Sequence, residues 1–376
     1  MMNIPLSSAD ITEKEYKAVL SVLKTKRIAL GPKLKEFEKE FARYIGTKYA
    51  IAVNAGTSGL HLVVRSLGIK KGDEVITTPF SFIASANCIL FEQAKPVFVD
   101  IDPQTLNMDS AKIEKAITRK TKAILAVDIF GHSVDWTPIL KIGKKYKLKI
   151  IEDSCEALGA EYKGKKCGTF GQAAVFAFYP NKQITTGEGG LIVTNNKKIH
   201  DLCRSMMNQG REVKGETWLE HVRLGYNYRM SDINAALGLT QILKIKQIIK
   251  KRDQVAQTYN HYLSNIPNLQ IPYVAPWAKI SWFVYVIQLA PNFTRKKRDL
   301  ILKKLQKSGI QCSNYFQCIH LQPFYRKLFG YKRGDFPIAE SVSDRTIALP
   351  FYNDLKEKEI EYIIKTLNNV IAKNKK

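Results

Sequence analysis

Residues 176–190 read FAFYPNKQITTGEGG, a stretch that combines a strand, a turn and a candidate reactive lysine. Its apolar, aromatic start predicts a buried strand, which ends near Pro180 because proline cannot donate to a strand ladder. Lys182 is therefore expected at the mouth of a strand. The glycines at 187, 189 and 190 let the backbone approach other groups closely before a second strand begins at Leu191. A lysine positioned in this way attacks carbonyl groups when desolvation or a neighbouring cation lowers its pKa. The alternative is a surface lysine in a loop.

The region before this stretch alternates between short apolar runs and segments long enough to be helices. The runs are AIAV (50–53), EVIT (74–77), PVFVD (96–100), AILAV (123–127) and KIIED (149–153). This alternation predicts an α/β fold with a mostly parallel central sheet and helices on both faces. Two helices are expected earlier, over 11–25 and 33–44. Because ligands of such sheets bind beyond the carboxyl ends of the strands, the residues after each run are candidates for a site.

Two of these strand ends carry residues suited to an anion and to a planar ligand. Gly56 and Thr57 lie in NAGTSG, directly before an expected helix. The free N–H groups of a helix start, together with nearby hydroxyls, form an anion site, and a plain helix cap is the alternative. Phe80 and Phe82 follow the EVIT run. Either ring could belong to the core, or it could cover a planar ligand.

The KIIED run leads into three carboxylates, Glu152, Asp153 and Glu156. Burying an unpaired charge at the end of an apolar strand would cost several kcal/mol, so a cationic partner is expected. Two interpretations stay open. The acids could cap the following helix, or Asp153 could face a positively charged ring nitrogen.

The length of 376 residues exceeds a typical single core and predicts two domains of unequal size. A long amphipathic helix is expected from about Lys246 to Leu263, and the boundary is placed close to its start, giving domains 1–245 and 246–376. The second domain is expected to be a smaller α+β unit, with strands at 282–290 and 309–316 and helices at 294–309 and 356–372.

The composition sets limits on partners and location. Lys and Arg number 59 against 34 Asp and Glu, a net charge of +25 that suits anionic partners. The charge is spread along the chain, which favours solvated faces and no nucleic-acid partner. No run is long enough to span a membrane and no signal region is visible, so we expect no membrane insertion and a cytoplasmic protein. The six cysteines show no zinc spacing, and we expect reduced thiols and no metal site.

Taken together, the motifs resemble the DegT/StrS-type nucleotide-sugar aminotransferases, which use pyridoxal 5′-phosphate (PLP) on the aspartate-aminotransferase, or type I, fold. The resemblance covers nearly the whole chain, and the order and spacing of the strings make it specific. The strings are IPLSSADITEKEY, GPKLKEFEKEFARYIG, NAGTSGLHL, GDEVITTPFSFIASAN, KPVFVDIDPQTLNMD, IIEDSCEALGA, FYPNKQITTGEGG and GYNYRMSDINAALGLTQ.

The resemblance implies a role for each matching residue. Lys182 would be the catalytic lysine that forms a Schiff base with the cofactor. The remaining cofactor contacts would be Asp153 at the pyridinium nitrogen, Phe82 stacked on the ring, Gly56 and Thr57 at the phosphate, Glu156 near the phenolic oxygen, and Asn227 at a phosphate across a dimer interface. A homodimer with shared active sites follows from the role of Asn227.

The resemblance also implies a reaction. It is transamination of a nucleotide-diphosphate keto-sugar, with a 4-keto-6-deoxy sugar and L-glutamate expected, pyridoxamine phosphate as the intermediate cofactor form, and an amino sugar for surface glycans such as lipopolysaccharide O-antigen as product. Some relatives carry histidine at the position of Lys182 and remove a hydroxyl. The alternatives are thus a dehydratase-like or aminocyclitol-directed enzyme, a non-catalytic regulator, or a nucleic-acid binder.

The chain departs from the family pattern at two positions. Ala177 stands where a phosphate-binding serine is common, which predicts slightly weaker cofactor retention. Glu156 stands where glutamine or histidine is frequent. Tyr315 and His320 match a segment that lies near the sugar site in the family, and either could instead belong to the core.

Overall fold

A computed structural model describes residues 2–212 and 220–373. Its centre is a seven-stranded sheet in the order β1-β9-β8-β5-β4-β2-β3, in which β9 alone runs antiparallel to its neighbours. The strands are β1 (Tyr49–Val53), β2 (Glu74–Thr77), β3 (Lys95–Phe98), β4 (Thr121–Val127), β5 (Lys149–Asp153), β8 (Ala173–Ala177) and β9 (Gly190–Thr194). The predicted α/β fold with a mostly parallel sheet is confirmed, and the five apolar runs before residue 176 each form one of these strands.

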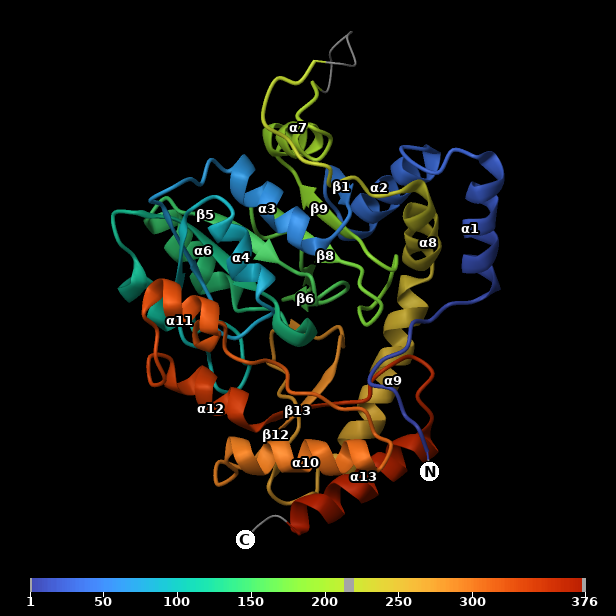
Figure 1. The fold of residues 1–376 in the computed structure, drawn as a ribbon, viewed down its shortest axis with the longest axis vertical. Helices are drawn as coiled ribbons and strands as arrows, with labels where there is room; N and C mark the ends of the chain where they lie inside the picture. The colour runs from blue at the N-terminus through green and yellow to red at the C-terminus, as the bar shows by residue number, and fades with distance from the viewer. Residues whose placement is uncertain (1, 213–219, 374–376) are drawn as a thin grey trace.

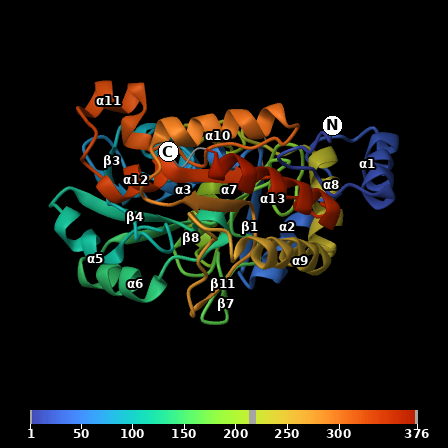
Figure 2. The ribbon, with the colours of Figure 1, turned by 90° about the horizontal axis from the view of Figure 1, so that it is seen from below.

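Helices cover both faces of this sheet because alternate strand residues are apolar on both sides. Leu125 and Ile151 pack under α3 (Gly56–Ser66), α4 (Ala84–Leu90) and α7 (Lys197–Met206). Their chain neighbours Ile124 and Ile150 pack under α5 (Ser110–Ile113) and α6 (Trp136–Lys145) on the opposite face. Figure 2 shows α3 and α6 on opposite sides of β4 and β8.

The two predicted N-terminal helices are present as α1 (Glu13–Thr25) and α2 (Pro32–Ile45). Both lie against α8 (Asp232–Leu243). α2 buries Phe37 and Phe41 in the core, whereas α1 leaves Tyr16, Leu20 and Leu23 about half exposed. These three side chains therefore point away from the core of their own chain, whereas Val22 of the same helix is buried.

The C-terminal part forms a second layered unit, seen in the lower half of Figure 1. An antiparallel sheet of β10 (Leu269–Gln270), β12 (Tyr285–Leu289) and β13 (Thr346–Leu349) packs with α10 (Arg295–Lys307) and α13 (Glu357–Ala372). α9 (Ile245–Leu263) begins in the core of the large sheet, with Ile245 and Ile248, and ends in that of the small sheet, with Tyr259 and Leu263. The division into 1–245 and 246–376 stays a prediction.

Short elements complete the part of the chain that the structure describes. They are the small sheet of β6 (Glu161–Tyr162), β7 (Lys165–Lys166) and β11 (Ala278–Lys279), the helices α11 (Pro323–Phe329) and α12 (Pro337–Arg345), and the 3₁₀ turns η1 (Glu114–Ala116), η2 (Ile129–Gly131) and η3 (Ile319–Leu321). Within residues 2–212 and 220–373, no helix has the length and apolar character needed to cross a lipid bilayer.

The expected strand over 309–316 is wrong. This segment makes only single-residue bridges, from Ile310 to Ile4 and from Ser313 to Ala348, and two different partners cannot support one ladder. The bridge at Ile4 ties the beginning of the chain into the C-terminal unit. The N–H of Ile4 donates to the Gly309 carbonyl at 2.8 Å, and Ile4 is completely buried.

Candidate active site

A cavity of about 620 Å³ lies at the carboxyl ends of β1, β2, β4, β5 and β8. Seven of the nine site residues expected from sequence line it: Gly56, Thr57, Phe82, Asp153, Glu156, Lys182 and Tyr315. The wall on the other side comes from the C-terminal unit, through Phe283 and Asn314. Both halves of the chain therefore build one site.

Lys182 is held in a turn between β8 and β9. Its N–H donates to the Tyr179 carbonyl at 2.9 Å, and the loop is closed where the Phe178 N–H donates to the Gly189 carbonyl at 2.9 Å. The Lys182 side chain is 13% exposed, with Nζ 3.4 Å from Glu156 Oε1 and 3.8 Å from the centre of the Phe283 ring. The ring face attracts the ammonium and also shields it from water. Lys182 is thus a positioned and largely buried amine at the wall of the cavity.

Asp153 ends β5 with its carboxylate directed at the cavity, 3% exposed and held by two donors. Ser85 Oγ donates to Oδ2 at 2.7 Å, and the Cys155 N–H donates to Oδ1 at 3.2 Å. Two fixed hydrogen bonds orient the carboxylate, and a cationic ring nitrogen in the cavity would complete its surroundings. Sequence reasoning missed Ser85, because nothing distinguishes it from the other small residues of α4.

Glu156 lies deep in the cavity wall. Its Oε2 accepts a hydrogen bond from the Phe130 N–H at 2.9 Å, and its Oε1 faces Lys182. Burial raises the pKa of the Glu156 carboxyl, and the nearby Lys182 ammonium opposes that rise. Because these two influences on its pKa oppose each other, the Glu156 carboxyl could exchange a proton with the phenolic oxygen of a bound cofactor.

Glu152 faces away from the cavity, and the expectation that its charge needs a cation is wrong. Backbone N–H groups of Gly168, Phe170 and Gly171 donate to its carboxylate. Ser154 Oγ lies 3.2 Å from Glu152 Oε1 and 2.8 Å from Asp128 Oδ2, on the adjacent strand end. Three backbone dipoles therefore replace the missing cation.

An anion cup is formed where α3 begins. Ala55 is extended, so the N–H groups of the first helical turn, from Gly56 onward, have no partner within the helix. A Cβ on Gly56 would lie 2.7 Å from Ala177 Cβ and 3.1 Å from Cys155 Sγ, so only glycine keeps the cup open. Ala177 faces this cup, where it supplies no hydroxyl, and the Thr57 side chain lines the cavity.

The structure separates the two phenylalanines left open by the sequence. Phe80 is completely buried, whereas Phe82 is 59% exposed at the cavity. The Phe82 ring therefore has a free face for a planar ligand, while Phe80 is a core residue.

Two expected site residues do not line the cavity of their own chain. Asn227 is exposed and its backbone bridges to Asn208, which is consistent with a role toward a second subunit. His320 is completely buried, with Nε2 3.0 Å from Glu340 Oε1 and its ring against Phe336. His320 therefore follows the alternative of a core residue.

Arg252, on α9, supports the cavity wall from behind and was also missed. It is buried, and it donates to the Trp282 carbonyl at 2.7 Å, the Phe283 carbonyl at 2.8 Å and Asn353 Oδ1 at 3.0 Å. Burial lowers the pKa of Arg252 to about 10. Its carbonyl partners come from a distant part of the chain, so no local sequence signal could reveal this role.

The residues present fit PLP. The cavity combines a shielded lysine, a fixed carboxylate for a ring nitrogen, an exposed aromatic face and a helix start for a phosphate, on a mostly parallel sheet. Fold and site together define the class of PLP-dependent transferases of type I fold.

The comparisons with known proteins give the family. The model of the DegT/DnrJ/EryC1/StrS aminotransferase family matches residues 9–368, and the chain belongs to this family. It is a PLP-dependent aminotransferase.

Similarity to individual proteins extends over nearly full lengths. The chain is 41% identical to the uncharacterized protein MJ1066 of Methanocaldococcus jannaschii, covering 97% of each chain. It is 39% identical to the GDP-perosamine synthase of Caulobacter vibrioides, covering 96% of each. The structure of Helicobacter pylori PseC, an aminotransferase of pseudoaminic acid biosynthesis, matches with a TM-score of 0.94 and 32% identity, covering 99% of this chain and all of that one.

Proposed function

We propose that the protein transfers an amino group from L-glutamate to a nucleotide-diphosphate keto-sugar, a 4-keto-6-deoxy sugar by preference, giving an amino sugar for a surface glycan. The observation that carries the transamination is the placement of Lys182 and Asp153 in one cavity. The sugar class is supported by relatives, since GDP-perosamine synthases and PseC are named for amino-sugar biosynthesis.

PLP, when bound, supplies an electron sink that stabilises negative charge at the α-carbon of the donor. Asp153 holds a proton on the ring nitrogen, since its buried carboxylate favours the charged form of that nitrogen. Gly56, Thr57 and the first turn of α3 would hold the phosphate, and Phe82 would cover the ring. These contacts orient the reacting atoms and leave the chemistry to one mobile amine.

Lys182 moves the proton. Its Nζ would act first as a general base, taking a proton from the donor α-carbon, and then as a general acid that gives the proton back. The Phe283 ring covers one side of this amine, and the Lys182 side chain is largely buried. In the second half of the reaction, with the keto-sugar, the Lys182 amine would move a proton in the reverse direction.

The active enzyme is proposed to be a homodimer in which Asn227 of each subunit contributes to the site of the other. The half-exposed side chains of Tyr16, Leu20 and Leu23 on α1 support a protein contact on that side of the molecule.

The test is a visible absorption spectrum of the protein with PLP, before and after L-glutamate. Wild type should show a band of lysine-bound cofactor that glutamate converts to the aminated form. Lys182→Ala should lack that band, whereas the surface variant Lys141→Ala should behave as wild type. A wild-type protein without such a band would overturn the catalytic role of Lys182 and favour a regulator.

The acceptor is then identified with a panel of nucleotide keto-sugars and keto-cyclitols. Amination of a nucleotide-linked keto-sugar is the expected outcome. Turnover restricted to keto-cyclitols, or loss of a sugar hydroxyl in place of amination, would assign the protein to the other branches of its family.

A further inference from the structure

A second cavity, of about 670 Å³, lies at the opposite edge of the large sheet. Three connections line it, each leading into a strand: 67–73 before β2, 117–121 before β4, and 146–149 before β5. The proposed active site uses the carboxyl ends of these same strands. Since β4 is seven residues long, the two sites are about 20 Å apart, and neither can be part of the other.

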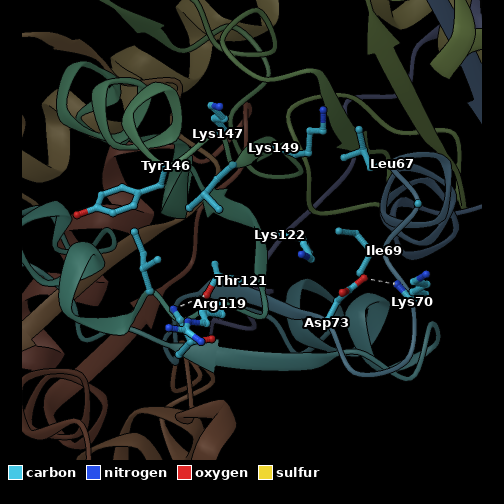
Figure 3. A pocket seen from close by; sticks show the side chains of 14 residues that line it. Leu67, Ile69, Lys70, Asp73, Arg119, Thr121, Lys122, Tyr146, Lys147 and Lys149 are labelled. Atoms are coloured by element: carbon cyan, nitrogen blue, oxygen red, sulfur yellow. Dashed lines mark hydrogen bonds between the residues drawn. The ribbon is translucent and has the colours of Figure 1, made fainter.

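Five basic side chains converge on this cavity: Lys70, Arg119, Lys122, Lys147 and Lys149. All five are exposed. In Figure 3, Lys122, Lys149 and Arg119 surround the hollow between the Lys70–Asp73 turn on one side and Tyr146 on the other. The dashed line at the Lys70–Asp73 turn is the hydrogen bond from the backbone N–H of Lys70 to Asp73 Oδ2 at 3.0 Å, in which the Lys70 ammonium takes no part.

The charge of the cavity is not neutralised from within. Among residues 2–212 and 220–373, no carboxylate lies within 4.0 Å of the side-chain nitrogen atoms of these five residues. Asp73 is the one carboxylate in the described lining, and Glu74 lies at its margin, where it accepts a hydrogen bond from Thr118 Oγ1 at 2.6 Å, so the five basic groups keep a formal charge of +3. The C-terminal ends of α3 and α6 also point here and contribute about −0.5 each, so a charge of about +2 stays without a counterion.

We infer that this basic cavity binds a phosphorylated small molecule of the nucleoside diphosphate class. Its volume lies in the range that encloses one small ligand. The lysines and arginine supply charged donors for phosphate oxygens, and the Leu67 and Tyr146 side chains supply an apolar wall for the rest of the molecule. The basic groups come from three connections around a hollow, and they do not form a stripe along a groove. This arrangement favours a compact anion over an extended nucleic acid.

The binding test uses ADP, UDP and inorganic pyrophosphate with the PLP-loaded protein in isothermal titration calorimetry at low salt. Lys122→Glu/Lys149→Glu should weaken nucleotide binding at this cavity by about tenfold or more, because two attractive contacts become repulsive. The control Lys358→Glu/Lys365→Glu carries the same charge change on α13, at a distance, and should bind as wild type. Lys122→Gln/Lys149→Gln gives a milder variant, and melting temperatures verify that every variant is folded.

Photolabelling with 8-azido-ADP locates the bound nucleotide. The inference is supported if labelled peptides come from 117–122 or 146–149, are protected by ADP, and disappear in the Lys122/Lys149 variants. It is overturned if labelling is confined to the Lys182 cavity, if all variants bind alike, or if only RNA binds, with steep salt dependence. The spectral response to L-glutamate should be unchanged in these variants. Failure of nucleotide binding at this cavity can therefore be told apart from failure of the proposed aminotransferase function.

Discussion

Replacing Asp128 by asparagine should leave the protein stable, although Asp128 is completely buried and hydrogen-bonded. Burial, and then the neighbouring Glu152, raise the pKa of the Asp128 carboxyl well above its usual range. The Ser154 hydroxyl has one proton to give, and it lies between the two carboxyls. We therefore place the extra proton on Asp128, which donates to Ser154, which in turn donates to Glu152. Asparagine reproduces this arrangement, since its amide donates to Ser154 and its oxygen accepts from the Val134 N–H.

The matched substitution Glu152→Gln should be damaging. The Glu152 carboxylate accepts three backbone N–H groups, and the amide of glutamine would face at least one of them with a donor of its own. Each buried N–H left unpaired costs about 1–3 kcal/mol, so the free energy of unfolding should fall by at least about 1–3 kcal/mol. For Asp128→Asn near pH 5, the same hydrogen-bond count gives a change within about 1 kcal/mol.

Thermal unfolding of both variants between pH 5 and pH 9 provides the assay. The unfolded Asp128 loses its proton near its ordinary pKa of 3.8, whereas the folded form keeps it to higher pH. Wild-type stability from this group is therefore fully present below that value and is lost as pH rises toward the folded pKa. Asparagine does not titrate, so the melting temperature of Asp128→Asn should rise relative to that of wild type with increasing pH. Glu152→Gln should melt several degrees below wild type over the whole pH range. The proton assignment would be refuted if the stability of Asp128→Asn relative to wild type fell as the pH rises. It would also be refuted if Asp128→Asn were less stable than Glu152→Gln.

Three further predictions concern the proposed cofactor site. Ala177→Ser adds a donor beside the start of α3 and should lower the PLP dissociation constant by about 3–10-fold in titrations of the apoenzyme; an unchanged constant would count against the anion cup. Arg252→Gln removes buried charged donors behind the cavity and should lower the free energy of unfolding by about 2–4 kcal/mol in urea titrations, unlike the exposed control Lys250→Gln. Mixed dimers of Lys182→Ala and Asn227→Ala subunits should regain activity that neither parent has, and no recovery after verified subunit exchange would argue against shared sites.

The sequence was sufficient for the elements whose signals are local. The apolar runs before residue 176 became strands because both of their faces are buried. Lys182 and Asp153 line one cavity because the carboxyl ends of neighbouring strands share one edge. The glycine at 56 was also recognisable, since a helix start after a strand is a local pattern. These features depend on short-range geometry.

The features that escaped prediction depend on distant contacts. Phe283 shields Lys182 only because the C-terminal unit folds against the sheet, and Ser85 acts only through its neighbour in space, Asp153. The segment 309–316 has the composition of a strand, yet its two backbone partners lie at opposite ends of the chain. Glu152 and Asp153 looked alike in sequence, but adjacent positions on a strand face opposite sides.

The tie between the first residues and the C-terminal unit sets an order for biosynthesis. The Leu6 N–H donates to Gln311 Oε1, 305 residues later in the chain, and Ile4 pairs with the segment beside it. At about 5–20 residues per second, a ribosome needs roughly 15–60 s to make the partner after the N-terminal segment has emerged. During that time the apolar Ile4 and Leu6 have no native site. The large sheet can assemble meanwhile, but residues 4–6 cannot reach their native positions until residues 309–311 have been synthesised.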